Sequence, residues 1–185
     1  MKLTNLERYL QSYGKYVVQQ SRTNLTKAKK NVSKDLYNSI RYKVEFVNGE
    51  FSIDFYMNDY GMYVDKGVSG KSKIQDYVNY DNKKVESPFK YTTKGPPIDI
   101  LSKWIKARGI KPTGFKRGRS TKTGQYISGF AYLISRKILR EGIKSTSFFQ
   151  RPLNLATRKF GVGILRAFRE DIITVFSKEI KTSVQ

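Results

Sequence analysis

Residues 40–57 read IRYKVEFVNGEFSIDFYM, and this stretch decides more of the fold than any other. Apolar and polar residues alternate on both sides of Asn48-Gly49, which is the pattern of two β-strands joined by a tight turn. Asn-Gly suits the two central positions of a type I′ turn, because both positions need a positive φ. We therefore predict a β-hairpin between Ile40 and Met57, with a register fixed by its two-residue loop.

This register places every residue of the hairpin on one of two faces. Pairing outward from Val47 opposite Glu50 gives one wholly apolar face, with the pairs Phe46 and Phe51, Val44 and Ile53, Tyr42 and Phe55, and Ile40 and Met57. The other face carries Lys43 opposite Asp54 and Arg41 opposite Tyr56, which is typical of a surface that meets solvent or a partner. The pattern therefore predicts that the hydrophobic core covers only the apolar face of the hairpin.

The composition restricts the classes of function. The chain has 185 residues without an internal repeat, which predicts one domain over residues 1–185. It contains no cysteine and no histidine, so the sequence excludes disulfides, thiolate or histidine metal sites and a histidine-based catalytic triad. The apolar runs are too short to cross a bilayer and the first residues do not read as a signal peptide, so we expect no membrane partner and a cytoplasmic start.

The charge is strongly positive. The chain has 36 Lys and Arg against 15 Asp and Glu, a formal net charge of +21. Such a balance favours association with polyanions such as nucleic acid, or with acidic protein surfaces. The positive residues are spread along the chain and are densest between Lys111 and Lys122, so the charge alone leaves these partners open.

The apolar pattern predicts an amphipathic helix before the hairpin and three helices after it. The first runs from about Thr4 to about Ala28 and covers the sheet. The second follows Pro96-Pro97 and ends near Gly109, and the third spans about Ser128 to Glu141. The inward residues of the third are Phe130, Leu133, Ile134 and Ile138. The last helix has an apolar stripe that must lie on something, made of Ile164, Leu165, Phe168, Ile172, Val175, Phe176 and Ile180.

The remaining segments complete the predicted fold. Alternation after the turn signal Asn58-Asp59 predicts a third antiparallel strand near Tyr60 to Asp65. Residues 67–95 are predicted to form a long loop, of a length that is typically either functional or disordered until bound. Residues 109–125 are predicted to form a mobile basic loop. The fold class is therefore α+β, with a small antiparallel β-sheet packed by N-terminal, central and C-terminal helices.

No set of residues predicts catalysis. Glu45, Asp54 and Lys43 could hold a divalent cation for a nuclease, but an ordinary charged strand face explains them about nine times in ten. We therefore expect no enzyme, no cofactor and no metal. The stronger alternative is a nucleic-acid-binding module that acts through the 111–122 loop, whose candidate residues are Lys111, Lys116, Arg117, Arg119 and Lys122.

Several motifs appear in an order that resembles the neck and tail-completion proteins of tailed bacteriophages, the family of head-tail connectors. Leu36-Tyr37-Asn38-Ser39-Ile40 leads into the hairpin, Tyr60-Gly61-Met62-Tyr63-Val64-Asp65-Lys66-Gly67 follows, and Ile100, Trp104, Ile105, Gly109 and Ile110 form the next signal. The segments 131–138, 142–143 and 148–153 then resemble the closing helix, the linker and the start of the final helix of that family. The resemblance covers about residues 36–153.

This resemblance implies a structural role in the virion. It implies a ring of about six or twelve copies at the phage neck, contacting other neck, portal-side adaptor and tail proteins after assembly in the host cytoplasm. Whether the positive charge faces packaged DNA in the channel or acidic subunits stays open. The segments 60–70 and 109–124 are expected at subunit contacts, and Trp104 is either an interface anchor or, by about two to one, a core residue. The full set of interface candidates is Tyr60, Tyr63, Asp65, Lys66, Trp104, Phe148, Phe149 and Arg151.

Overall fold

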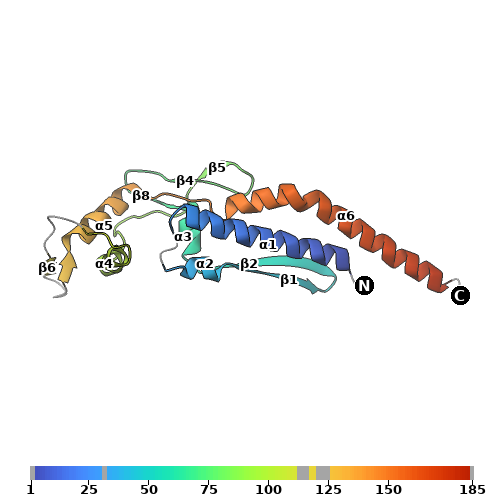
Figure 1. Ribbon diagram of the computed structural model, residues 1–185. Coiled ribbons are helices and arrows are strands. Elements are labelled where there is room, and N and C mark those ends of the chain that lie inside the picture. The colour runs from blue at the N-terminus through green and yellow to red at the C-terminus, as the bar shows by residue number, and fades with distance from the viewer. Residues whose placement is uncertain (1–2, 31–32, 112–116, 120–125, 184–185) are drawn as a thin grey trace. The chain divides into compact units, whose positions relative to one another are not determined.

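The computed structural model describes residues 3–30, 33–111, 117–119 and 126–183, and it has the predicted α+β class (Figure 1). The described residues form six helices and four two-stranded antiparallel sheets. They divide into two compact units. Unit 1 comprises Met1–Asp59, Asn79–Asn82 and Phe148–Gln185, and unit 2 comprises Tyr60–Val78 and Lys83–Ser147. Folding of residues 1–185 as a single domain stays a prediction.

The hairpin of unit 1 has the predicted register. Strands β1 (Arg41–Val47) and β2 (Glu50–Tyr56) pair at every predicted position from Val47 opposite Glu50 to Arg41 opposite Tyr56. Asn48 and Gly49 have φ values of 52° and 87°, as the turn requires. The predicted pair of Ile40 and Met57 lies outside the strands, because Ile40 ends the short helix α2 (Asp35–Ser39) and is fully buried.

Helix α1 (Thr4–Lys27) covers the apolar face of the hairpin, as predicted. Leu6, Val17, Val18 and Leu25 are its buried apolar residues. Gly14 faces the ring of Tyr42 on β1 so closely that a Cβ atom there would lie 2.3 Å from the ring carbon Cδ2. A glycine in mid-helix, which costs helix stability, is therefore required by packing.

Replacing Gly14 with alanine is expected to destabilise the protein, although the same change in an unhindered helix is stabilising. The new methyl group would displace the Tyr42 ring, and such overpacking costs about 1–3 kcal/mol. Chemical denaturation of the G14A variant measures this loss. The double variant with Tyr42→Ala is the control, since removing the ring should make Gly14→Ala neutral or favourable. A stabilised G14A single variant would contradict the close approach.

Helix α6 (Gln150–Ser183) runs antiparallel to α1 in unit 1 (Figure 1). The pairing is fixed near both ends. Asn24 Nδ2 donates to the carbonyl of Phe148 at 3.4 Å, just before α6 begins. At the other end the carboxylate of Asp171 accepts from the backbone N–H of Leu6 at 2.8 Å and from Asn5 Nδ2 at 2.9 Å. Asp171 is thus a tertiary cap for the first turn of α1.

In unit 2 the predicted third strand is wrong. Residues Gly61–Lys66 form the short helix α3, in which Val64 N–H donates to the carbonyl of Tyr60 at 3.2 Å. The helix brings Gly61 and Asp65 to one buried side and leaves Tyr63 exposed. Six alternating residues fit one and a half helical turns as well as a strand, so tertiary contacts decide the outcome.

The segment predicted as a long loop, residues 67–95, contains three short strands. Strand β3 (Val68–Ser69) pairs with β8 (Gly142–Ile143), and β4 (Asp76–Val78) pairs with β5 (Lys84–Glu86). Residues 89 and 91 also bond to the backbone of Ser69. The prediction failed because strands of two or three residues are too short to show a period.

Two helices pack to form the core of the rest of unit 2. They are α4 (Ile98–Ala107) and α5 (Gly129–Glu141), joined by the β6 (Arg117–Arg119) and β7 (Tyr126–Ser128) ribbon. Leu101, Ile105 and Ala131 form this core, and three of the four residues predicted as inward on α5 pack against it, namely Phe130, Ile134 and Ile138. Leu133 does not, being 51% exposed. The core position favoured for Trp104 is also wrong, since its side chain is 39% exposed.

Candidate functional site

The largest exposed apolar feature of unit 1 lies on α6. Six side chains of this helix, each between 51% and 71% exposed, form what we call the α6 stripe: Leu155, Val162, Leu165, Ile173, Phe176 and Ile180. Their spacing of mostly three, four, seven or eight residues places them along one side of the helix. With a rise of about 1.5 Å per residue, the stripe is about 38 Å long.

The α6 stripe faces away from α1, because α6 uses its other side for packing. That other side consists of small or capping residues, of which Pro152, Ala156, Ala167 and Asp171 are buried. Gly163 belongs to it too, since a Cβ there would lie 2.6 Å from the ring of Tyr9. Small residues let the helices approach closely, and one large ring adds to the contact, because Phe160 packs edge-on against Tyr13 and Tyr16 of α1. The six residues of the α6 stripe remain exposed beside this contact.

Four arginines accompany the stripe along its first half. Arg151, Arg158, Arg166 and Arg169 are exposed on or beside the stripe, and the sequence has no acidic residue between Arg151 and Arg169. Arg158 and Arg169 stand three or four residues from stripe members on either side, so apolar and positive side chains alternate along this part of the helix. Exposed apolar surface marks interaction sites, and a partner with acidic groups opposite these arginines would match its charge.

The interface candidates of unit 2 lie in different environments. Tyr60 and Tyr63 are 44% and 47% exposed. The ring of Tyr63 packs against that of Phe89, with the two ring centroids 4.5 Å apart. Asp65 is 1% exposed, so it offers no surface to a neighbour. The Lys66 ammonium lies 5.7 Å from the Tyr77 ring centroid. The two tyrosines thus remain surface candidates.

The exposed Trp104 is the fifth candidate in unit 2. The guanidinium of Arg108 lies 5.8 Å from its ring centroid, one helical turn away on the same side of α4. An exposed tryptophan partly covered by arginine is a composition enriched at protein interfaces. This placement keeps Trp104 as an interface candidate.

The candidates of unit 1 divide in the same way. Phe148 is fully buried and is among the largest side chains without exposure. The Phe149 ring lies 5.5 Å from that of Phe55 on the hairpin, in an edge-on arrangement. Arg151 is exposed at the start of α6. Phe148 therefore serves the core, and Arg151 is one of the arginines that accompany the α6 stripe.

The 111–122 loop falls mostly outside the described residues. Lys111 is exposed directly after the turn that follows α4. Lys116 and Lys122 lie outside the described part, and of Arg117 and Arg119 only the backbone, in β6, is described. The structure therefore leaves this candidate nucleic-acid site as a prediction.

On the charged face of the hairpin Lys43 lies opposite Asp54, as predicted. The Lys43 ammonium pairs with Glu45 on its own strand, not with Asp54 across the hairpin. The hydrogen bond to Glu45 raises the pKa of Lys43 above its ordinary value. Among the residues that the structure describes, no group of three His, Cys, Asp or Glu residues is placed to hold a metal ion.

Neither a membrane-spanning helix nor a similarity to known proteins indicates the function. In the described ranges no helix is both long and apolar enough to cross a membrane. Comparisons with protein-family models, with curated proteins and with solved structures found no match. The α6 stripe is therefore the main feature from which function is inferred. Its residues overlap the predicted stripe at Leu165, Phe176 and Ile180. The sequence predicted that this stripe must lie on something without indicating what covers it.

Proposed function

We propose that the chain is a structural subunit of a tailed-phage virion, a head-to-tail connector or tail-completion protein that assembles as a ring at the neck. The observation that carries this proposal is the α6 stripe, together with the resemblance of residues 36–153 to that family. Its partners would be further copies of the chain and other neck, portal-side adaptor and tail proteins. Its place would be the neck or tail of the virion, after assembly in the host cytoplasm.

The energetics of the α6 stripe favour a protein partner. Covering six side chains that are now half or more exposed contributes roughly 10 kcal/mol before the cost of association, which is large enough to hold a specific complex. If the stripe of one copy meets a different surface of the next copy, the contact is heterologous and can close into a ring. Acidic groups on that second surface would complement the arginines of α6.

Assembly is expected to depend on the α6 stripe. Val162 and Leu165 are 71% and 70% exposed, so Val162→Glu with Leu165→Glu should leave the fold intact and bury two charges in the contact. We expect the purified protein to form a concentration-dependent oligomer, and the double variant to weaken this association at least about hundredfold. Analytical ultracentrifugation and native mass spectrometry measure both.

The matched control introduces the same two charges elsewhere in unit 1. Ser12 on α1 and Thr174 on α6 are exposed and lie off the stripe, with side chains that bond to helix carbonyls one turn back. The variant S12E/T174E should assemble like the unchanged protein. A chain that stays monomeric up to about 100 μM, or stripe and control variants that behave alike, would count against assembly through the stripe.

The second candidate function is nucleic-acid binding through the 111–122 loop, which the high density of positive charge in that segment favours. Replacing Lys116, Arg117 and Arg119 with alanine should then flatten the salt dependence of DNA binding. An unchanged salt dependence would remove this candidate.

A further inference from the structure

The positive charge of the chain is concentrated in unit 2. The segments Tyr60–Val78 and Lys83–Ser147 contain 19 Lys and Arg against 5 Asp and Glu, so they carry +14 of the total of +21. Unit 2 has fewer than half of the residues of the chain. Most of the excess positive charge therefore belongs to unit 2, so a site for a polyanion is expected on the surface of this unit.

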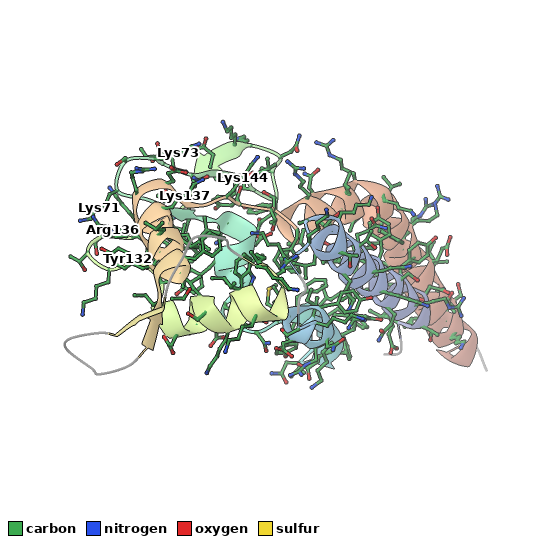
Figure 2. All side chains as sticks on the ribbon, turned by 60° about the vertical axis from the view of Figure 1, so that its left-hand side comes forward. Lys71, Lys73, Tyr132, Arg136, Lys137 and Lys144 are labelled. Atoms are coloured by element: carbon green, nitrogen blue, oxygen red, sulfur yellow. The ribbon has the colours of Figure 1, made fainter. Side chains whose placement is uncertain are left out.

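Six cations lie on the described part of unit 2 around the C-terminal half of α5, and all but Arg140 are labelled in Figure 2. We call this group the α5 patch, and its members are Lys71, Lys73, Arg136, Lys137, Arg140 and Lys144, all exposed. Four of them, with the hydroxyl-bearing Ser72, line a hollow of about 440 Å³ between the segment after β3 and α5. Tyr132 lies on α5 beside Arg136 in Figure 2 and is 47% exposed.

The backbone holds the two halves of the α5 patch together. The N–H groups of Lys71 and Ser72 donate to the carbonyls of Leu139 and Arg140, both at 2.9 Å. These bonds satisfy two carbonyls at the end of α5 and fix Lys71 beside the helix. The negative end of the helix dipole accounts for one or two cations in the last turn, but not for six cations from three segments.

One acidic residue interrupts the α5 patch. Glu141 Oε1 accepts from the Arg140 guanidinium at 2.7 Å, and Lys137 Nζ lies 3.9 Å from its other oxygen. The bond from Arg140 lowers the pKa of Glu141 below its ordinary value, so this carboxylate is charged at neutral pH. The patch therefore keeps about five net positive charges, most of them free to meet an external anion.

The size and chemistry of the α5 patch fit a nucleic-acid backbone. Tyr132, Arg136 and Arg140 follow one another at intervals of four along α5, in a row about 12 Å long. Duplex DNA presents one negative charge per about 1.7 Å, or about seven charges over that length. The hydroxyls of Ser72 and Tyr132 add donors of the kind that bind phosphate.

The surroundings of the cations favour duplex nucleic acid over two other partners, which are single-stranded nucleic acid and acidic protein. Single-strand binding sites use several aromatic rings as stacking platforms, whereas the α5 patch has one exposed ring, that of Tyr132. Protein interfaces are depleted of charge at their centre, whereas four of the residues that line the central hollow are cations, beside Ser72, Leu133 and Leu139. We infer that the α5 patch is a binding site for the phosphate backbone of duplex DNA, separate from the 111–122 loop.

The test uses the full chain and a short fluorescein-labelled DNA duplex of mixed sequence, with anisotropy measured from about 50 to 200 mM salt. The patch variant K71Q/R136Q/K137Q is expected to lose at least about tenfold in affinity at the lowest salt, and to reduce the slope of log K against log salt by about 3. All three positions are exposed, and circular dichroism verifies the fold of each variant.

The matched control is K103Q/K106Q/R108Q, which removes two lysines and one arginine from exposed positions on and beside α4 in the same unit. It should reduce the affinity less than about threefold. Equal losses in the patch and control variants would overturn the inference in favour of diffuse charge. A patch variant that binds the duplex like the unchanged protein would also overturn the inference. Binding of poly-glutamate without binding of the duplex would overturn it too, because that is the behaviour of a site for acidic protein.

Discussion

Replacing Phe148 with alanine is expected to lower the free energy of unfolding of unit 1 by about 3–5 kcal/mol, the cost of removing a fully buried aromatic side chain. Phe148 has no exposed surface and lies just before α6, where its carbonyl accepts the bond from Asn24 on α1. The cavity left by the substitution would therefore form at the end of the α1–α6 pair where Asn24 bonds to residue 148. Equilibrium denaturation in urea, followed by circular dichroism, measures the loss.

The same substitution on the α6 stripe provides the control for Phe148. Phe176 is 59% exposed, so Phe176→Ala should change the stability of the isolated chain by less than about 0.5 kcal/mol. The contrast between the two variants separates a residue that holds the subunit together from one that is available to a neighbour. A larger loss for F176A than for F148A would contradict both assignments.

Removing the Asp171 carboxylate should cost about 2–4 kcal/mol, because Asp171→Ala deletes a helix cap and leaves partly buried donors without partners. The side chain is 5% exposed and accepts from the backbone N–H groups of Asn5 and Leu6 at 3.2 and 2.8 Å. The loss should be concentrated in the first turn of α1. Hydrogen exchange at the amides of Asn5 and Leu6 should become faster in the D171A variant.

Two controls define the role of Asp171. Asp171→Asn keeps one acceptor oxygen and loses the charge, so its effect should be intermediate. Glu170→Ala removes the neighbouring carboxylate, which is exposed, and should have little effect. If E170A destabilised the protein as much as D171A, the capping role of Asp171 would be wrong.

The parts of the fold that followed from sequence are those that local chemistry specifies. Asn48-Gly49 allowed one turn type and hence one register, and the strand pairs of the hairpin agree with it. Gly142, with a φ of 82°, ends α5. In both cases a short motif has one favourable conformation whatever surrounds it.

Tertiary contacts decided the parts that sequence missed. Residues 61–66 became helical because the backbone carbonyls of Val64 and Asp65 meet the segment before Phe148, accepting from Thr146 and Ser147 at 3.2 and 2.9 Å. Leu133 fits the apolar period of α5 but points away from α4. A period identifies an apolar residue without saying which element, if any, will cover it.

The two proposed interaction surfaces were partly visible in the sequence. The apolar period of α6 was apparent, but its exposure follows from the small residues Ala156, Gly163 and Ala167 on the other side, which pack on α1. The α5 patch was missed because Lys71 and Arg136 are far apart in the chain and come together only through the bonds to the end of α5. Local charge density pointed instead to residues 111–122.

We propose that this chain is a fixed component of a virion. Quantitative mass spectrometry of purified phage particles from the source tests it most directly, with the major capsid protein as the internal standard. The proposal predicts a constant, low copy number per particle, of about six or twelve. Absence of the chain from clean particles, or a copy number that varies between preparations, would contradict it.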